Sequence, residues 1–394
     1  MVSQPSNRTI PAQRVRGFGT TIFSEMSALA LEHQAINLGQ GFPDFDGPEV
    51  VKQAAIEAIS RGINQYAPGI GDRRLRHAIA EHVARFYGRA VDPEGEITVT
   101  AGATEAIFAV MQGLLDPGDE VVLFEPFYDS YVPSITMAGG VPRYVPLHPP
   151  DWDFDPEALR AAFGPRTKAV LLNTPHNPTG KVFGQEELVL IGELCQEHDA
   201  VIISDEVYEH LTYDGVRHLS PADLPGLAER TMTVSSVAKS FSLTGWKVGW
   251  AIAPPPLTTA LRRAHQFITF CAAAPLQRAA GVALKLPDGY FQNLAADYQR
   301  KRDYLVRALQ EAGFRVYLPK GTYFVMADFR PLGFEDDVTF CRYLTVEVGV
   351  AAIPPSFFYS EAHKALGKPL VRFAFCKRLE TLQAAAERLR RISR

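Results

Sequence analysis

The sequence predicts an α/β protein with a mainly parallel sheet and a second, smaller α+β unit. Short apolar runs alternate with helical patterns through the middle of the chain. Polar clusters follow several of these runs, as loops do at the carboxyl ends of parallel strands. After about residue 285 the pattern changes to a long charged helix, short strands and a final amphipathic helix.

The middle region supplies the expected sheet. The apolar runs that we expect to form strands are ITVT (97–100), EVVLFEP (120–126), AVLLNTP (169–175), AVIISDEVY (200–208) and TMTVSS (231–236). Helical patterns follow two of them, TEAIFAVMQGLL (104–115) and EELVLIGELCQEH (186–198). This alternation is typical of βαβ units, whose sheet is covered by helices on both faces. Ligands of such sheets bind beyond the carboxyl ends of the strands, so we expect the functional site there.

The last third of the chain has a different order of elements. A charged helix is expected over 293–313, strands in RVYLP (315–319), TYFVMADF (322–329) and VRFAFC (371–376), and a helix over 379–392. The helical segments show apolar positions three and four residues apart. We therefore expect a smaller α+β unit here.

Composition excludes several functional classes. The formal charge of −4 disfavours a dedicated nucleic-acid binder. The four cysteines (Cys195, Cys271, Cys341 and Cys376) form no CxxC pair, so we expect neither a metal site nor a disulfide framework. No apolar run reaches the roughly 18–20 residues of a membrane span, and the N-terminus lacks the apolar core of a secretory signal. We expect a cytoplasmic protein.

Lys239 is the first candidate catalytic residue, in TMTVSSVAKSFSLTGWKVGWAIAP. A single lysine is usually only a solvated charge, but this one lies between two apolar strand-like segments, with Ser236 before it and Lys247 after it. An aldehyde cofactor needs an amine for a Schiff base, and its phosphate needs donors and positive charge. This segment contains both.

Asp205 ends an apolar run, where it could cap a helix or pair with a cationic ring nitrogen. Tyr208 follows three residues later and could donate to a phenolic oxygen of the ring. Asn173 and Asn177 flank a proline-rich turn, and turn chemistry is compatible with an amide donor at the cofactor.

Further candidates follow two other strands. Gly102, Ala103 and Thr104 lead into a helix, whose N-terminal amides could bind a phosphate. Phe127 could stack on a planar ring, although core packing is the alternative. In VRFAFC, Arg372 alternates with apolar residues, so it either forms a structural salt bridge or binds a substrate carboxylate.

Together the motifs LGQGFPDF, QYAPGIGDRRLR, NTPHNPTG, SDEVY, SSVAKSFSLTGWKVGW and VRFAFCK resemble those of fold-type I, class I and II aminotransferases. Within that family the chain is most similar to the methionine, glutamine and kynurenine aminotransferase branch, from about residue 15 onward. The resemblance implies an aspartate aminotransferase-like fold with a mainly parallel seven-stranded sheet. It also implies a homodimer, an N-terminal arm and part of the small domain over 1–45, a large domain over 46–285 and a small domain over 286–394.

The resemblance also implies pyridoxal 5'-phosphate as cofactor, with small-molecule amino acids and 2-oxo acids as substrates. Lys239 would be the Schiff-base lysine, and Asp205 would pair with the pyridinium nitrogen. Tyr208 and Asn177 would bind the ring oxygen, Phe127 would stack on the ring and Asn173 would lie near the cofactor. The residues implied for the phosphate are Gly102, Ala103, Thr104, Ser236, Lys247 and Tyr66 of the partner subunit. Arg372 would bind the substrate carboxylate, with Asn177 and the backbone of Gly41.

Two departures bear on the substrate. Phe23 stands where kynurenine-type enzymes have tryptophan, and Cys271 stands where they have histidine after Phe270. A pocket of Phe23 and Phe270 favours apolar or thioether side chains, and no second arginine suits an ω-carboxylate. We expect ping-pong transamination of methionine, glutamine or phenylalanine-like substrates, with Lys239 transferring the proton. The alternatives are a cysteine-conjugate β-lyase, a kynurenine aminotransferase and a non-catalytic cofactor-binding regulator.

Overall fold

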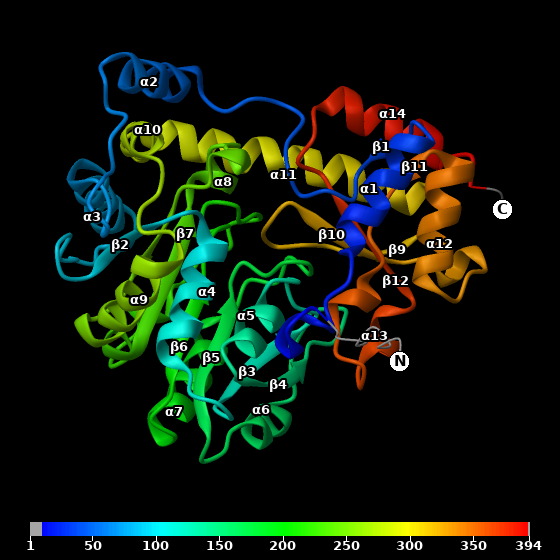
Figure 1. Ribbon diagram of the computed structural model, residues 1–394. Coiled ribbons are helices and arrows are strands. Elements are labelled where there is room, and N and C mark those ends of the chain that lie inside the picture. The colour runs from blue at the N-terminus through cyan, green and yellow to red at the C-terminus, as the bar shows by residue number, and fades with distance from the viewer. Residues whose placement is uncertain (1–9, 393–394) are drawn as a thin grey trace, which may run out of the picture.

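The large part of the molecule is built on a seven-stranded sheet, which the computed structural model shows at the centre of residues 10–392, the described part of the chain (Figure 1). Residues 1–9 of the predicted N-terminal arm lie outside the described residues. The strand order is β2-β8-β7-β6-β5-β3-β4, and β8 alone runs antiparallel to its neighbours. The strands are β2 (Ile97–Thr100), β3 (Glu120–Glu125), β4 (Val141–Pro146), β5 (Thr167–Asn173), β6 (Val201–Asp205), β7 (Thr231–Ser236) and β8 (Gly249–Ile252). The predicted mainly parallel sheet is confirmed.

Helices cover both faces of the sheet. Successive residues of each strand point to opposite faces, so each strand contributes side chains to both helical layers. On β5, Val170 and Leu172 pack with α6 and α7, whereas Ala169 and Leu171 pack with α4, α5 and α9. The helices of this part are α2 (Glu49–Ser60), α3 (Arg73–Tyr87), α4 (Ala103–Leu114), α5 (Tyr131–Met137), α6 (Pro156–Ala162), α7 (Gln185–Glu197), α8 (Val237–Ser240), α9 (Pro255–Ile268) and α10 (Ala274–Leu284). The edge strand β4 did not stand out in the sequence because two prolines and partly exposed positions interrupt its pattern.

A smaller α+β unit lies beside this sheet and combines residues 22–37 with the C-terminal third of the chain (Figure 1). Its antiparallel sheet has the order β12-β10-β9, and a two-stranded parallel sheet pairs β1 with β11. The strands are β1 (Ile36–Asn37), β9 (Arg315–Tyr317), β10 (Phe324–Asp328), β11 (Val350–Ala351) and β12 (Leu370–Ala374), and the helices are α1 (Ile22–Glu32), α11 (Asp288–Glu311), α12 (Asp337–Tyr343), α13 (Lys364–Gly367) and α14 (Leu379–Leu389). The pairing of β1 with β11 brings the N-terminal segment against the C-terminal third.

The predicted elements of the last third are present with shifted ends. Helix α11 begins at Asp288, earlier than the expected residue 293, because Pro287 precedes its first turn in an extended conformation. The division at residues 45/46 and 285/286 stays a prediction. No helix within residues 10–392 combines the length and the apolar character needed to cross a bilayer.

Candidate active site

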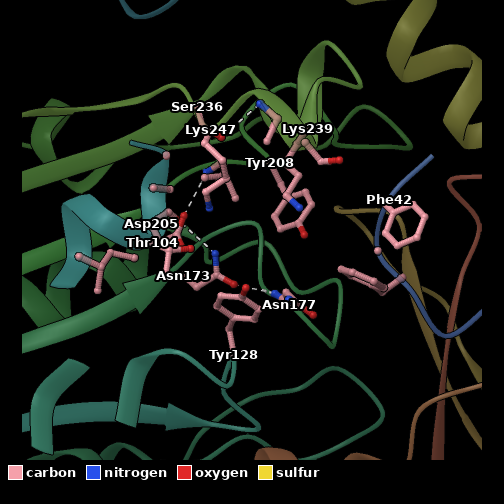
Figure 2. Close-up of a pocket in the computed structure, with 18 of the residues that line it drawn as sticks. Phe42, Thr104, Tyr128, Asn173, Asn177, Asp205, Tyr208, Ser236, Lys239 and Lys247 are labelled. Carbon is pink, nitrogen blue, oxygen red and sulfur yellow. Dashed lines mark hydrogen bonds between the residues drawn. The ribbon is translucent and has the colours of Figure 1, made fainter. Parts of the chain in front are cut away.

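A cavity of about 370 Å³ lies where the carboxyl ends of the central strands face the smaller unit. Its volume is in the range of small-molecule sites. The sequence-predicted residues that line it are Phe23, Gly41, Gly102, Ala103, Thr104, Asn173, Asn177, Asp205, Tyr208, Ser236, Lys239, Lys247 and Arg372. Figure 2 shows that Lys247, Asp205 and Asn173 converge on one side of this cavity, while Phe42 lies at the opposite end.

Lys239 is positioned by a short helix that starts as β7 ends. The Ser236 hydroxyl caps this helix, α8, by accepting a hydrogen bond of 3.3 Å from the backbone N–H of Ala238. The Lys239 ammonium lies 5.6 Å from the ring centroid of Tyr208. Burial lowers its pKa to about 8, although Cys376 and Asp205 favour the charged form. A large fraction of the amine is therefore neutral near pH 8 and able to act as a nucleophile or base.

Gly102 and Lys247 form a cationic corner at the start of α4. Gly102 has φ +85°, and a Cβ placed on it would lie 3.2 Å from the Lys247 Nζ. Glycine therefore leaves room for the ammonium beside the helix N-terminus, where the backbone N–H groups of Ala103 and Thr104 have no partner within the helix. Free amides, the helix dipole and an ammonium together favour a phosphate.

Asp205 is a buried carboxylate at the end of β6. Its Oδ2 accepts a hydrogen bond of 2.7 Å from the Tyr131 hydroxyl, and its Oδ1 accepts one of 3.3 Å from the N–H of Val207. Within residues 10–392, no side-chain cation lies within 4.0 Å of its oxygens. Burial raises the pKa of Asp205 to about 6, despite the hydrogen bond from Tyr131. A cationic ring nitrogen would restore its ionised form.

The backbone of Asp205 also holds the asparagine pair. The Asn173 side chain donates a hydrogen bond of 2.9 Å to the Asp205 carbonyl and accepts one of 2.7 Å from the backbone N–H of Asn177, as the dashed lines in Figure 2 show. These bonds join the proline-rich turn to the end of β6. The predicted turn and site roles of the asparagines are therefore structurally compatible.

Arg372 enters the cavity from β12 and is almost fully buried. Its two terminal nitrogens donate to Asn177 Oδ1 at 3.0 Å and to the carbonyl of Gly39 at 2.8 Å. Its Nε is buried without a hydrogen-bond partner in the described part of the chain, and burial lowers the pKa of Arg372 to about 10. No carboxylate within residues 10–392 forms a salt bridge with Arg372. The alternative role, a structural salt bridge, is therefore not seen in the described part of the chain. A guanidinium held this way suits a free carboxylate ligand.

Aromatic rings surround this guanidinium. Its Cζ lies 4.1 Å from the ring centroid of Phe324 and 5.1 Å from that of Phe23 and that of Phe358. Gly41 lies against the same ring, because a Cβ there would meet Phe324 Cζ at 2.6 Å. The substrate side of the cavity is therefore cationic at one point and apolar around it.

Phe127 does not line the cavity, contrary to its predicted stacking role. Its ring packs at 5.8 Å on Tyr144 within the core, while the next residue, Tyr128, lines the cavity. The backbone N–H of Phe127 donates to the Phe358 carbonyl at 2.8 Å, which orients this loop. The core-packing alternative therefore describes Phe127, and Tyr128 is the candidate for ring stacking.

Tyr66 and Phe270 also lie outside the cavity of their own chain. Tyr66 is 84% exposed, and its ring packs edge-on against Phe270 at 5.5 Å. Phe270 therefore forms no pocket with Phe23 within one chain. Both rings are instead exposed at the surface of the chain.

Sequence reasoning missed several cavity residues. Among them are Tyr128 and Tyr131 in EPFYDSY and Phe324 in TYFVMADF. Both motifs were recognised as a polar cluster and a strand, but loop geometry decides which side chain faces the cavity. Phe324 could have been found from strand alternation: Met326 pairs with Arg372, and Phe324, two residues earlier on β10, points to the same face of the sheet.

The residues present fit pyridoxal 5'-phosphate. The cavity offers one amine, an amide-rich cationic corner for a phosphate and a buried carboxylate for a ring nitrogen. A further guanidinium remains for the substrate.

Comparisons with known proteins agree with this arrangement. The family described as aminotransferase class I and II matches residues 33–389. Methionine aminotransferase of Escherichia coli is 44% identical over 389 residues, covering 98% of this chain and 100% of that protein. The kynurenine–oxoglutarate transaminase of Dictyostelium discoideum is 40% identical, covering 98% and 97%. The solved structure of N-succinyldiaminopimelate aminotransferase from Mycobacterium tuberculosis is 49% identical, with a TM-score of 0.94 over 97% of this chain and 100% of that chain. This chain belongs to the class I and II aminotransferases, a family that is PLP-dependent in general, and is an aminotransferase with the fold-type I architecture.

Proposed function

We propose that this aminotransferase uses pyridoxal 5'-phosphate to move an amino group from an apolar, thioether or amide L-amino acid to a 2-oxo acid. The observation that carries the proposal is the placement of Arg372 among aromatic rings. Among the described residues that line the cavity, the only other lysine or arginine side chains are Lys239 and Lys247, which lie in the cofactor segment. One carboxylate is matched by a cation, and the rest of the substrate faces Phe23, Phe42 and Phe324.

The residues of this chain then have separate tasks. The bound cofactor supplies an aldehyde for the substrate amine and a protonated ring that withdraws electrons from the substrate Cα. Lys239, as a neutral amine, accepts the Cα proton and donates it again as an ammonium. Asp205 keeps the ring nitrogen charged, and Arg372 orients the substrate through its carboxylate. The cycle runs twice, once for each substrate, as a ping-pong mechanism requires.

We further propose a homodimer that works in the cytoplasm. Tyr66 and Phe270 support the dimer because both are aromatic, in contact with each other and exposed on one chain. In the dimer, Tyr66 would reach the phosphate of the partner's cofactor, and Phe270 would complete the partner's apolar substrate pocket.

A second candidate substrate is N-succinyldiaminopimelate, which the name of the Mycobacterium tuberculosis structure indicates for that protein. Such a substrate carries carboxylates far from its reacting amine. The cavity of one chain lacks a further cation for them within residues 10–392, so this function requires a cation from the second subunit. This requirement makes it the less favoured of the two.

The test is a panel of amino donors against several 2-oxo acids, with products identified by mass. Methionine, glutamine and phenylalanine should be the best donors, and aspartate should be poor because its ω-carboxylate has no matching cation. Kynurenine and N-succinyldiaminopimelate serve as competing donors, and a preference for either would overturn the proposed substrate class. Pyruvate and ammonia formed from a cysteine conjugate without a 2-oxo acid would instead identify a β-lyase.

A separate variant tests the cofactor assignment. Lys239→Ala should lower turnover by at least about 10³-fold, because the group that transfers the proton is lost. It should also remove the visible absorbance that a lysine-bound pyridoxal group gives. Lys285→Ala, at an exposed ion pair with Glu81 directly after α10, is the matched control and should keep both properties. An active Lys239→Ala enzyme would disprove the assignment of Lys239 as the lysine that binds the cofactor and transfers the proton.

A further inference from the structure

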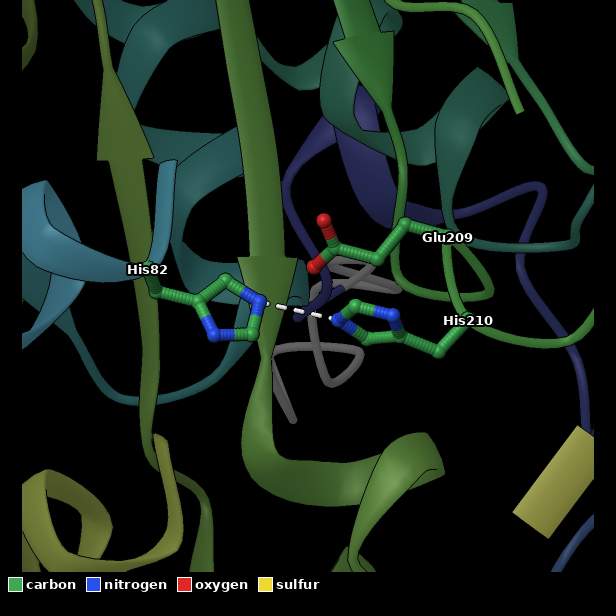
Figure 3. A group of neighbouring side chains, drawn as sticks. All are labelled: His82, Glu209 and His210. Atoms are coloured by element: carbon green, nitrogen blue, oxygen red, sulfur yellow. Dashed lines mark hydrogen bonds between the residues drawn. The ribbon is translucent and has the colours of Figure 1, made fainter. Parts of the chain in front are cut away.

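A second cluster of chemically reactive side chains lies outside the cavity, behind the turn that follows β6. His82 comes from α3, and Glu209 and His210 come directly after Tyr208 (Figure 3). One ligand atom from each residue lies within 4.8 Å of those of the other two. We propose that His82, Glu209 and His210 bind a divalent transition-metal cation of the zinc type.

The two imidazoles already face each other. The Nε2 of His82 lies 2.8 Å from the Nε2 of His210, so one nitrogen donates and the other presents a free lone pair. In a tetrahedral site with Zn–N bonds of about 2.0–2.1 Å, the two nitrogens stand roughly 3.3 Å apart. A rotation that separates the rings by about half an ångström therefore converts the pair into two ligands.

Aromatic side chains pack on both imidazoles. Phe86 and Phe291 pack against them at centroid distances of 4.4–5.5 Å. These two rings enclose the imidazoles on their apolar side.

Glu209 is oriented by two hydroxyl groups. The Tyr87 hydroxyl donates to one carboxylate oxygen, and the Ser235 hydroxyl donates to the other at 2.7 Å. Each oxygen keeps a second lone pair for a cation. Outer hydrogen bonds of this kind hold the ligands of metal sites in place.

A small cavity borders His82 and Glu209, two of the three proposed ligands. It has a volume of about 20 Å³ and is lined by His82, Tyr87, Glu209 and Ser235 among others. This volume accommodates one water molecule. Two imidazoles, one carboxylate and one water form a four-coordinate set typical of zinc, whereas Mg²⁺ and Ca²⁺ prefer more oxygen ligands.

The sequence gives no sign of this site, and no metal was expected from it. His82 and His210 are separated by 128 residues, and spacing rules detect only ligands that are near in sequence. The fold brings α3 against the turn that follows β6. Since Glu209 follows Tyr208 directly, an ion here would bind next to the active-site turn.

The experiment is zinc titration of the full-length chain, prepared without a histidine tag and stripped of metal, by isothermal titration calorimetry. We expect one Zn²⁺ per chain with micromolar or tighter affinity, and no binding of Mg²⁺. H210N and E209Q should each weaken binding at least tenfold. H33N, which changes an exposed histidine at the end of α1, should bind as the unsubstituted chain does.

The proposal would be overturned if zinc did not bind one-to-one, or if H210N and E209Q bound zinc as tightly as the unsubstituted chain does. Because a variant could lose its fold, a crystal of the unsubstituted chain soaked in zinc gives an independent answer. An anomalous peak about 2.0–2.1 Å from the Nε2 atoms of His82 and His210 is expected. A peak only elsewhere would also overturn it. Neither outcome depends on the proposed substrate or on aminotransferase activity.

Discussion

The Tyr131 hydroxyl donates a hydrogen bond of 2.7 Å to Asp205, and both side chains are buried in the wall of the cavity. Removing the hydroxyl with Tyr131→Phe raises the pKa of Asp205 further above about 6, because burial then acts against the charged form with less compensation. Hydrogen bonds to charged groups contribute about 1.5–3 kcal/mol, so we expect kcat to fall by about tenfold or more.

The pH profile distinguishes this role from a general packing defect. The acid limb of kcat should move to higher pH in Tyr131→Phe, since Asp205 acts as a carboxylate and now loses its charge at a higher pH. Tyr304→Phe, on α11 outside the cavity, is the control and should leave the profile unchanged. An unshifted acid limb in Tyr131→Phe would show that the hydroxyl does not act through Asp205.

Arg372→Lys should weaken amino acid binding more than it slows the chemical step. Lysine keeps the charge but cannot bond Asn177, Gly39 and a carboxylate with one planar group. We expect KM for the amino donor to rise by about 10–100-fold, equivalent to a lost charge-assisted hydrogen bond. Arg330→Lys, at an exposed arginine that pairs with the buried Asp328 outside the cavity, is a matched replacement that should change KM little. Similar kinetics in both variants would contradict a substrate role for Arg372.

Gly41→Ala should disturb the substrate side of the cavity through its neighbour. The added Cβ would lie 2.6 Å from Phe324 Cζ, so the ring must move, and with it the face that contacts Arg372. Overpacking of this kind costs about 1–3 kcal/mol, and we expect a lower Tm and a higher KM. Gly289→Ala, where nothing lies within 4 Å, should lower neither stability nor affinity. A Gly41→Ala enzyme with unchanged KM would show that the loop adjusts freely.

The amine of Lys239 should react with added cofactor at a lower pH than an ordinary lysine. Its pKa is lowered to about 8, and the neutral form is the nucleophile. The rate at which the cofactor-free protein takes up pyridoxal phosphate should rise with pH and level off above about pH 8. For an unperturbed lysine the rise would continue towards pH 10.5. Stopped-flow absorbance measures this rate, and a continued rise past pH 9 would refute the shift.

Local sequence was sufficient to predict much of the fold. Continuous apolar runs such as 169–175 indicate strands buried on both faces, and their spacing by helical patterns implies parallel neighbours. The positions of Asp205 and Ser236 follow from this, because residues at strand ends must lie along one edge of the sheet. Strand alternation likewise placed Arg372 on a face of β12 apart from Val371 and Phe373.

Other features depend on contacts between segments far apart in the chain. In EPFYDSY the sequence cannot tell which aromatic ring faces the cavity, because the loop conformation depends on packing against Tyr144 and Phe358. The same holds for the His82–His210 contact and for the exposure of Phe270.

The sequence by itself determined the residue types at the strand ends, and with them the amine, the carboxylate and the guanidinium. The tertiary structure decided which of these groups share a cavity and what surrounds each one. The physical reason is that periodicity and turn chemistry act over a few residues, whereas burial, which raises the pKa of Asp205 and lowers that of Lys239, exists only after distant segments have packed together.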